Sequence, residues 1–146
     1  LPILIPENYI YDLSLRLSIY RKLGELRSNE DFKFFEEEMI NRFGMIPNEF
    51  KNLIELVKLK VLAAKTKIIR IDANQEHIYI YFSKDFKDYP VEFINWITKN
   101  KNFIKLVDEF KIKIVIYKNI DIENLLLHVY EIVNTINLIL IKKEKI

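Results

Sequence analysis

The sequence has no cysteine, two glycines, four prolines and two histidines among its 146 residues. Without cysteine the chain can form neither a disulfide nor a thiolate metal site, and nothing indicates a secreted scaffold. With so few glycines it has no phosphate-cradling loop, and neither GxxxxGK[ST] nor GxGxxG occurs. The net charge of +2 is small, which argues against a dedicated nucleic-acid-binding domain with a strong basic excess.

Long hydrophobic runs are absent as well. The apolar stretch 136–141 is interrupted by Asn137 and is too short to cross a bilayer, so no membrane association is expected. The amino end lacks the pattern of a signal peptide. We therefore expect a cytoplasmic protein and, because the chain starts at Leu1 rather than Met, a segment of a longer one. The chain is 50% hydrophobic and 30% charged, the balance of a globular domain.

The amino-terminal part is expected to be an extended lead-in followed by a helix. Residues 1–11 carry two prolines among apolar residues, which favours an extended segment that packs over a neighbour or leads in from an upstream domain. Asp12 is a good N-cap for a helix over residues 13–23. The face predicted for this helix is formed by Leu13, Leu17 and Tyr20.

Two more helices are predicted, one that ends and one that begins within residues 36–47. A capping box at Ser28 and Asp31 starts a helix that ends at Phe43, with an apolar stripe at Phe32, Phe35, Met39, Ile40 and Phe43. Gly44 follows where a helix ends on a residue of positive φ, and Pro47 stands where the next helix begins. This third helix extends to about Lys65, with a stripe at Phe50, Ile54, Val57, Val61 and Ala64.

The hydrophobic period changes from 3.6 to 2 after the third helix. Strands are predicted at 68–71 and 78–82, a short helix from Pro90, a second hairpin at 103–107 and 111–117, and a last helix from about Asp121. Segregated helices and hairpins indicate an α+β fold. We predict three N-terminal helices, then hairpin, helix, hairpin, helix, with an antiparallel four-stranded sheet in a single domain over residues 12–146.

The residues give little support for a catalytic site or a metal-binding site. His77 and His128 lack the convergent ligands that a metal site needs, so structural roles are favoured. The run 36–38 is acidic, but adjacent helical residues point in different directions and cannot converge on a substrate. The serines have no nucleophile signature around them. We expect no catalytic residue, no metal and no cofactor in this chain.

The strand 78–82 permits a second interpretation. Tyr79 and Tyr81, with Lys111 and Lys113 nearby, are typical of a platform on which single-stranded nucleic acid stacks. Ordinary strand propensity and core packing explain the same residues, and the weak net charge favours that explanation. The corner at 38–47 has a similar alternative, in which it only sets helix packing and Arg42 is solvated or paired locally.

Three motifs give the chain a family resemblance. They are LPILIPENYIYD at 1–12, LRLSIYR at 15–21 and EMINRFGMIP at 38–47. In this order and spacing they resemble the C-terminal domain of the bacterial transcription-repair coupling factor family (Mfd), and the match extends over essentially the whole chain. Tyr11 replaces the usual Pro of the first motif, and Asn41 replaces the usual Asp of the third, which removes one negative charge from the corner.

The resemblance implies a regulatory domain of a longer protein. The parent resembles an ATP-dependent DNA translocase that removes stalled RNA polymerase and recruits the excision-repair protein UvrA. This domain is expected to dock in cis on a UvrB-like module and to mask its UvrA-binding surface. The implied docking residues are Glu37, Glu38, Asn41 and Arg42. An accessory nucleic-acid-binding domain that uses Tyr79, Tyr81, Lys111 and Lys113 is the alternative.

Overall fold

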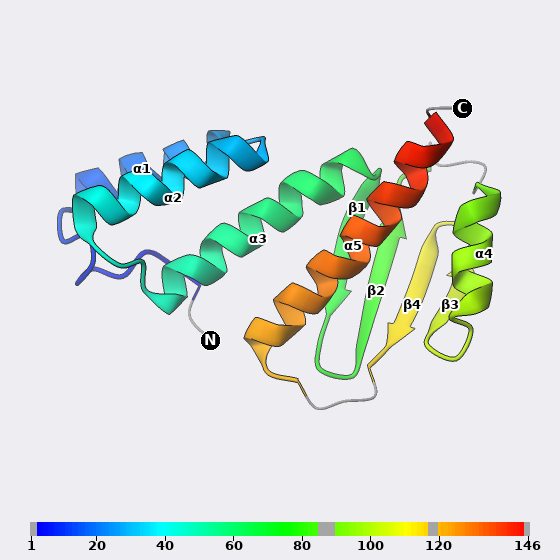
Figure 1. The fold of residues 1–146 in the computed structure, drawn as a ribbon. Helices are drawn as coiled ribbons and strands as arrows, with labels where there is room; N and C mark the ends of the chain where they lie inside the picture. The colour runs from blue at the N-terminus through cyan, green and yellow to red at the C-terminus, as the bar shows by residue number, and fades with distance from the viewer. Residues whose placement is uncertain (1–2, 85–89, 117–119, 145–146) are drawn as a thin grey trace. The chain divides into compact units, whose positions relative to one another are not determined.

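The structure, a computed structural model, describes residues 3–84, 90–116 and 120–144. Its elements are α1 (Leu13–Glu25), α2 (Asn29–Phe43), α3 (Asn48–Lys65), β1 (Ile68–Ala73), β2 (His77–Phe82), α4 (Val91–Lys99), β3 (Ile104–Asp108), β4 (Lys111–Val115) and α5 (Ile122–Glu144) (Figure 1). The predicted α+β class and element order are confirmed. Contacts divide the chain into two compact units, Leu1–Val61 and Leu62–Ile146, within what the sequence predicted as one domain.

The amino-terminal segment packs into the first unit instead of extending past it. The prediction of an extended lead-in is wrong at residues 7–9, where the chain turns. The carbonyl of Pro6 accepts hydrogen bonds from the N–H groups of Tyr9 and Ile10 at 3.1 and 3.2 Å. This turn allows Ile5 and Ile10, each 2% exposed, to enter the same hydrophobic core.

Helix α1 begins at the predicted cap but buries a different face. The Asp12 carboxylate accepts the N–H of Leu15 at 3.0 Å, as an N-cap should. Leu13 and Leu17, predicted to face the core, are 59% and 49% exposed, whereas Ile19 and Leu23 are 2% exposed. Apolar residues occur on both sides of this helix, so periodicity alone could not choose the buried one.

Helices α2 and α3 complete the core of the first unit. The capping box at Ser28 and Asp31 is confirmed, with both reciprocal hydrogen bonds present. Pro47 lies one position before α3, where its carbonyl accepts the first helical N–H groups. Two predicted core positions, Ile40 and Ala64, are exposed. These helices contribute Phe32, Phe35, Met39, Phe50 and Ile54 to the core cluster of the first unit.

The second unit is built on the predicted four-stranded antiparallel sheet, in the order β1-β2-β4-β3. Strand β2 pairs with β1 on one side and with β4 on the other, and β4 pairs with β3. A β-bulge lies between Ile68 and Arg70, and another between Leu106 and Asp108. Phe103, predicted to start the third strand, precedes it, and Tyr117 of the predicted fourth strand lies outside the described residues.

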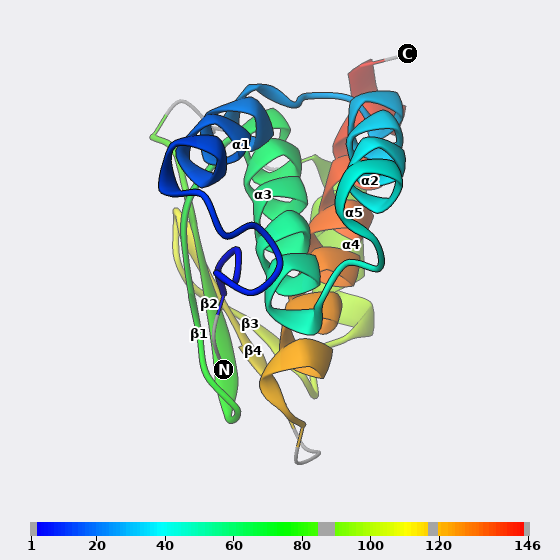
Figure 2. The same ribbon diagram turned by 90° about the vertical axis from the view of Figure 1, so that its left-hand side faces the viewer.

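Helices α4 and α5 lie on one side of this sheet (Figures 1 and 2). The core between them is formed by Ile78, Ile80, Phe82, Phe93, Ile112, Ile114, Val129, Val133 and Ile136. Trp96 packs beside Phe93 in α4, with ring centroids 5.7 Å apart. Ile78, Ile80 and Phe82 are more buried than Tyr79 and Tyr81. Among the described residues, no helix is long and apolar enough to span a membrane.

Candidate functional site

Gly44 forms the turn at the corner between α2 and α3. Its φ of 90° and ψ of −165° lie in a region that only glycine adopts readily, and its N–H still donates to the carbonyl of Ile40 at 3.0 Å. The predicted positive φ is confirmed, although the residue is more extended than a left-handed helical cap. A hypothetical Cβ at Gly44 would meet no atom within 4 Å, so backbone conformation alone requires glycine here.

Tyr9 fastens the amino-terminal segment to this corner. Its hydroxyl lies 2.8 Å from the carbonyl oxygen of Gly44 and 3.1 Å from that of Met39, and it donates to them. Its ring packs against Phe43 and Phe50, with centroids 5.7 and 5.8 Å away. Burial raises the pKa of the Tyr9 phenol, so the hydroxyl keeps its proton and remains a donor.

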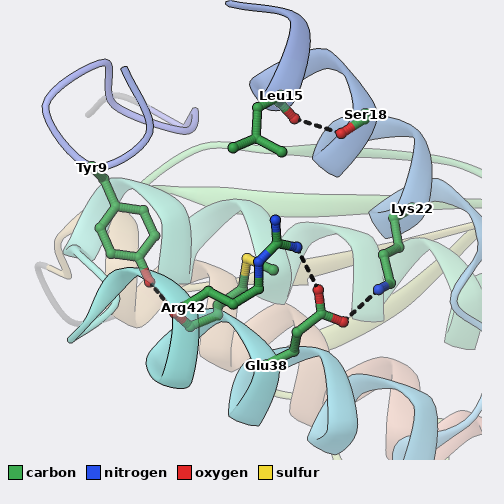
Figure 3. Close-up of polar contacts among 7 residues, drawn as sticks. Tyr9, Leu15, Ser18, Lys22, Glu38 and Arg42 are labelled. Carbon is green, nitrogen blue, oxygen red and sulfur yellow. Dashed lines mark hydrogen bonds and ion pairs between the residues drawn. The ribbon is translucent and has the colours of Figure 1, made fainter. Parts of the chain in front are cut away.

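Glu38 joins α1 to α2 through its carboxylate. One oxygen pairs with Lys22 of α1, and the other accepts from Arg42 one turn later in α2 at 2.9 Å (Figure 3). Hydrogen bonds from Lys22 and then from Arg42 lower the pKa of Glu38. The guanidinium of Arg42 also lies over the Phe43 ring, 4.9 Å from its centroid. Arg42 is therefore paired locally, as in the alternative in which the corner only sets helix packing.

The implied docking residues fall into two groups on α2. Glu37 and Asn41 are exposed and lie one helical turn apart, on the side opposite the buried Phe35 and Met39. Glu38 and Arg42 lie at the edge that faces α1 and are bound to each other. Among the described residues Glu37 has no ion-pair partner, so it is the acid of this group whose charge is not matched locally.

Sequence reasoning missed three exposed hydrophobic side chains, two on α2 beside Glu37 and one at the corner that follows the helix. Phe34 is 66% exposed, Ile40 is 52% exposed, and Met45 at the corner is 86% exposed. Phe34 lies three residues before Glu37, and Ile40 lies three residues after it, so they flank the carboxylate on one helix face. We call Phe34, Glu37, Ile40 and Asn41 the outer α2 face. For Phe34 the signal was available, because it lies outside the core stripe of its helix.

A second ion-pair group holds α2 to α3. Lys58 of α3 lies 3.5 Å from Glu36 and 3.3 Å from Glu55. Burial disfavours the charged ammonium, but the two carboxylates outweigh it and raise the pKa of Lys58. Of the three consecutive acids in α2, Glu36 therefore faces α3, Glu38 faces α1, and Glu37 alone points outward.

The described part of the chain contains no group of three or more His, Asp or Glu side chains that could hold a metal ion. His77 belongs to a turn in which the Asn74 side chain accepts the backbone N–H groups of Glu76 and His77 at 2.8 and 2.9 Å. The predicted divergence of Glu36, Glu37 and Glu38 is confirmed by their different neighbours.

Three N-terminal helices joined through a glycine corner, followed by a four-stranded antiparallel sheet, place the chain in a class of small α+β domains. The family model described as the TRCF domain matches residues 1–92. The chain belongs to this family, and the resemblance inferred from the three motifs is confirmed.

Relatives of known name agree with this assignment. The transcription-repair-coupling factor of Rickettsia conorii is 36% identical over 126 residues, which cover 84% of this chain and 11% of the relative. The factor of Escherichia coli is 24% identical over 115 residues, covering 79% of this chain and 10% of the relative. The chain thus spans only about a tenth of the length of these relatives. A crystal structure of the C-terminal domain of transcription-repair coupling factor shares the fold, with a TM-score of 0.73, 21% identity and coverage of 94% of this chain and 89% of that chain.

Proposed function

We propose that this chain is a regulatory domain that docks through its outer α2 face on a UvrB-like module of the same protein and masks the UvrA-binding surface of that module. The parent would be an ATP-dependent DNA translocase that removes stalled RNA polymerase. The observation that carries the proposal is the outer α2 face, where Phe34 and Ile40 are exposed on either side of an unmatched carboxylate. The family membership and the small share of each relative that the chain covers support a role within a longer protein.

The composition of this face suits a contact that can be released. Exposed aromatic and aliphatic side chains provide the buried centre of a protein interface, and a charge at their border provides orientation. A rim carboxylate contributes about 0–1 kcal/mol to such a contact, so no single ion pair makes it permanent. A competing state worth a few kcal/mol can then shift the equilibrium from masked to open.

Of the two implied docking acids, Glu37 is a better candidate than Glu38 for the electrostatic contact with the partner. Glu38 already binds Lys22 and Arg42, so Glu38→Lys would bring a third cation into that cluster and weaken the contact between α1 and α2. A change in docking by that variant could not be separated from a change in folding. Glu37→Lys reverses a charge that has no ion-pair partner in the described part of the chain, and it is the cleaner test.

The test measures binding of the 146-residue chain to the separately purified UvrB-like module of its parent. Phe34→Ala should weaken binding by more than about tenfold, because a large aromatic side chain at an interface centre carries much of the affinity. Glu37→Lys should weaken binding several-fold at low salt and less at high salt. Asn41→Asp should tighten it at low salt. In the parent protein, Phe34→Ala and Glu37→Lys should increase capture of UvrA.

Glu131→Lys supplies the matched control, since it makes the same charge reversal at an exposed position of α5 in the second unit. Equal binding by wild type, Phe34→Ala and Glu37→Lys, with all chains folded, would show that the docking surface is elsewhere. An equal loss of binding in Glu37→Lys and Glu131→Lys would show that binding depends on the net charge of the chain and not on the position of Glu37.

A further inference from the structure

One side of the sheet faces away from α4 and α5 (Figure 2). This side carries both aromatic rings and cations. Ile78 and Ile80 of β2 are fully buried at 0% exposure, so the alternating Tyr79 and Tyr81 point to the opposite side. In the register, Tyr81 lies opposite Arg70 of β1 and Lys111 of β4, and Tyr79 lies opposite Lys113. We call Tyr79, Tyr81, Arg70, Lys105, Lys111 and Lys113 the outer sheet face.

The cations of this face lie over the tyrosine rings. The Lys111 ammonium is 4.5 Å from the Tyr79 centroid and 4.9 Å from that of Tyr81. Lys113 is 5.8 Å from the Tyr79 centroid, and the Arg70 guanidinium is 5.3 Å from that of Tyr81. A cation–π contact that is open to solvent is a weak interaction. A phosphate can therefore draw a flexible lysine aside and leave the ring free to stack.

Carboxylates offset this positive charge only in part. Asp72 pairs with Arg70 at 3.0 Å, and Asp108, opposite Lys111 in the register, accepts the N–H of Phe110 at 2.8 Å. Within residues 3–84, 90–116 and 120–144, no ion pair involves Lys105, Lys111 or Lys113. Lys111 and Lys113 beside the two rings, and Lys105 on the next strand, thus remain available to an anionic ligand.

We propose that the outer sheet face binds a single strand of nucleic acid, with bases stacked on Tyr79 and Tyr81 and phosphates held by Lys105, Lys111 and Lys113. Alternate residues on a strand are about 6.6 Å apart, roughly twice the 3.4 Å between nucleotides along one strand of a duplex. The two rings therefore suit the splayed bases of an extended single strand, and bases stacked within a duplex cannot reach them. Rings alternating with cations form the arrangement that sequence-tolerant single-strand binding uses. An acidic protein segment would use only the lysines.

The test measures fluorescence anisotropy of a labelled oligothymidylate of about 15 nucleotides, and of an oligouridylate of the same length, with the 146-residue chain. Tyr79→Thr removes the ring but keeps a strand-favouring residue, and it should weaken binding about tenfold. Tyr79→Phe keeps the ring and should bind as wild type does. Lys111→Gln combined with Lys113→Gln should reduce the slope of log K against log salt by about 1.4.

The matched control is Lys33→Gln combined with Lys60→Gln, which removes the same charge from exposed helical positions of the first unit. It should leave binding close to that of wild type. No binding to either oligonucleotide by the folded chain at low salt would overturn the proposal, and so would equal weakening in the control pair. Equal competition by duplex DNA, or self-association through this face, would also overturn it. Because the outer α2 face is in the other unit, its role in docking is tested independently.

Discussion

At the scale of single residues, Gly44 carries the clearest conformational requirement. Its φ of 90° and ψ of −165° lie in a region closed to other residues, and no neighbouring atom would obstruct a side chain. Gly44→Ala and Gly44→Val should therefore lower the free energy of unfolding by similar amounts, at least about 1 kcal/mol each. Urea denaturation followed by circular dichroism measures this.

Gly24 provides the opposite control within the same unit. It lies in α1, and nothing lies within 4 Å of a Cβ added there. Gly24→Ala should raise the free energy of unfolding by roughly 0.5–1 kcal/mol, because alanine loses less conformational freedom in a helix. Unchanged stability in Gly44→Ala would mean that the corner relaxes to another backbone conformation.

Glu38 makes the free energy of unfolding depend on pH in the acidic range. Because hydrogen bonds from Lys22 and Arg42 lower its pKa in the folded state, its contribution is complete above the unfolded pKa of about 4.3. The contribution is lost as the pH falls through the lower, folded pKa. Glu38→Gln should thus be less stable than wild type by roughly 1 kcal/mol at neutral pH, and the difference should shrink below about pH 4.

The neighbouring Glu37→Gln is the control for that titration, since the described residues include no ion-pair partner for Glu37. Its stability at neutral pH should be close to that of wild type. A difference between wild type and Glu38→Gln that stays constant down to about pH 2 would show that the carboxylate acts through packing and not through charge.

At the scale of elements, every helix and strand was predictable because caps and periodicity are local. Ser28, Asp31 and Gly44 define the ends of α2 within a few residues of sequence. The buried side of α1 was not predictable, because its apolar residues surround the helix and only packing selects Ile19 and Leu23. The same limit applies to the site: Lys22 reaches Glu38 from sixteen residues away, a contact that depends on how α1 and α2 pack.

The buried face of α1 can be tested by making the same change, leucine to alanine, at a buried and at an exposed position. Leu23→Ala should cost about 2–5 kcal/mol, because it leaves a cavity in the core of the first unit. Leu17→Ala removes a side chain that is 49% exposed and should change stability by no more than about 0.5 kcal/mol. Thermal or urea unfolding distinguishes the two, and equal costs would mean that α1 is rotated from the position described.

At the scale of the whole molecule, the chain contains no nucleotide-binding loop, and we expect the purified chain not to hydrolyse ATP. The measurement is a phosphate-release assay with and without single-stranded DNA. A chain with a substitution at Glu36, which pairs with Lys58, is purified and assayed in parallel. Activity that is the same in both preparations is assigned to contaminating ATPases. Turnover that a point mutation in this chain abolishes would contradict the expectation.

The placement of Trp96 gives the second compact unit an optical signature of its own. It is the single tryptophan of the chain, and it packs beside Phe93 in α4 of the second unit. Its emission therefore reports on the second unit, whereas helical ellipticity arises from α1 and α2 in the first unit and from α4 and α5 in the second. Where the two signals change at the same urea concentration, the units unfold as one cooperative system. Where ellipticity falls while Trp96 emission stays native, the helical unit carrying the outer α2 face melts first, and a single unfolding free energy no longer describes the protein.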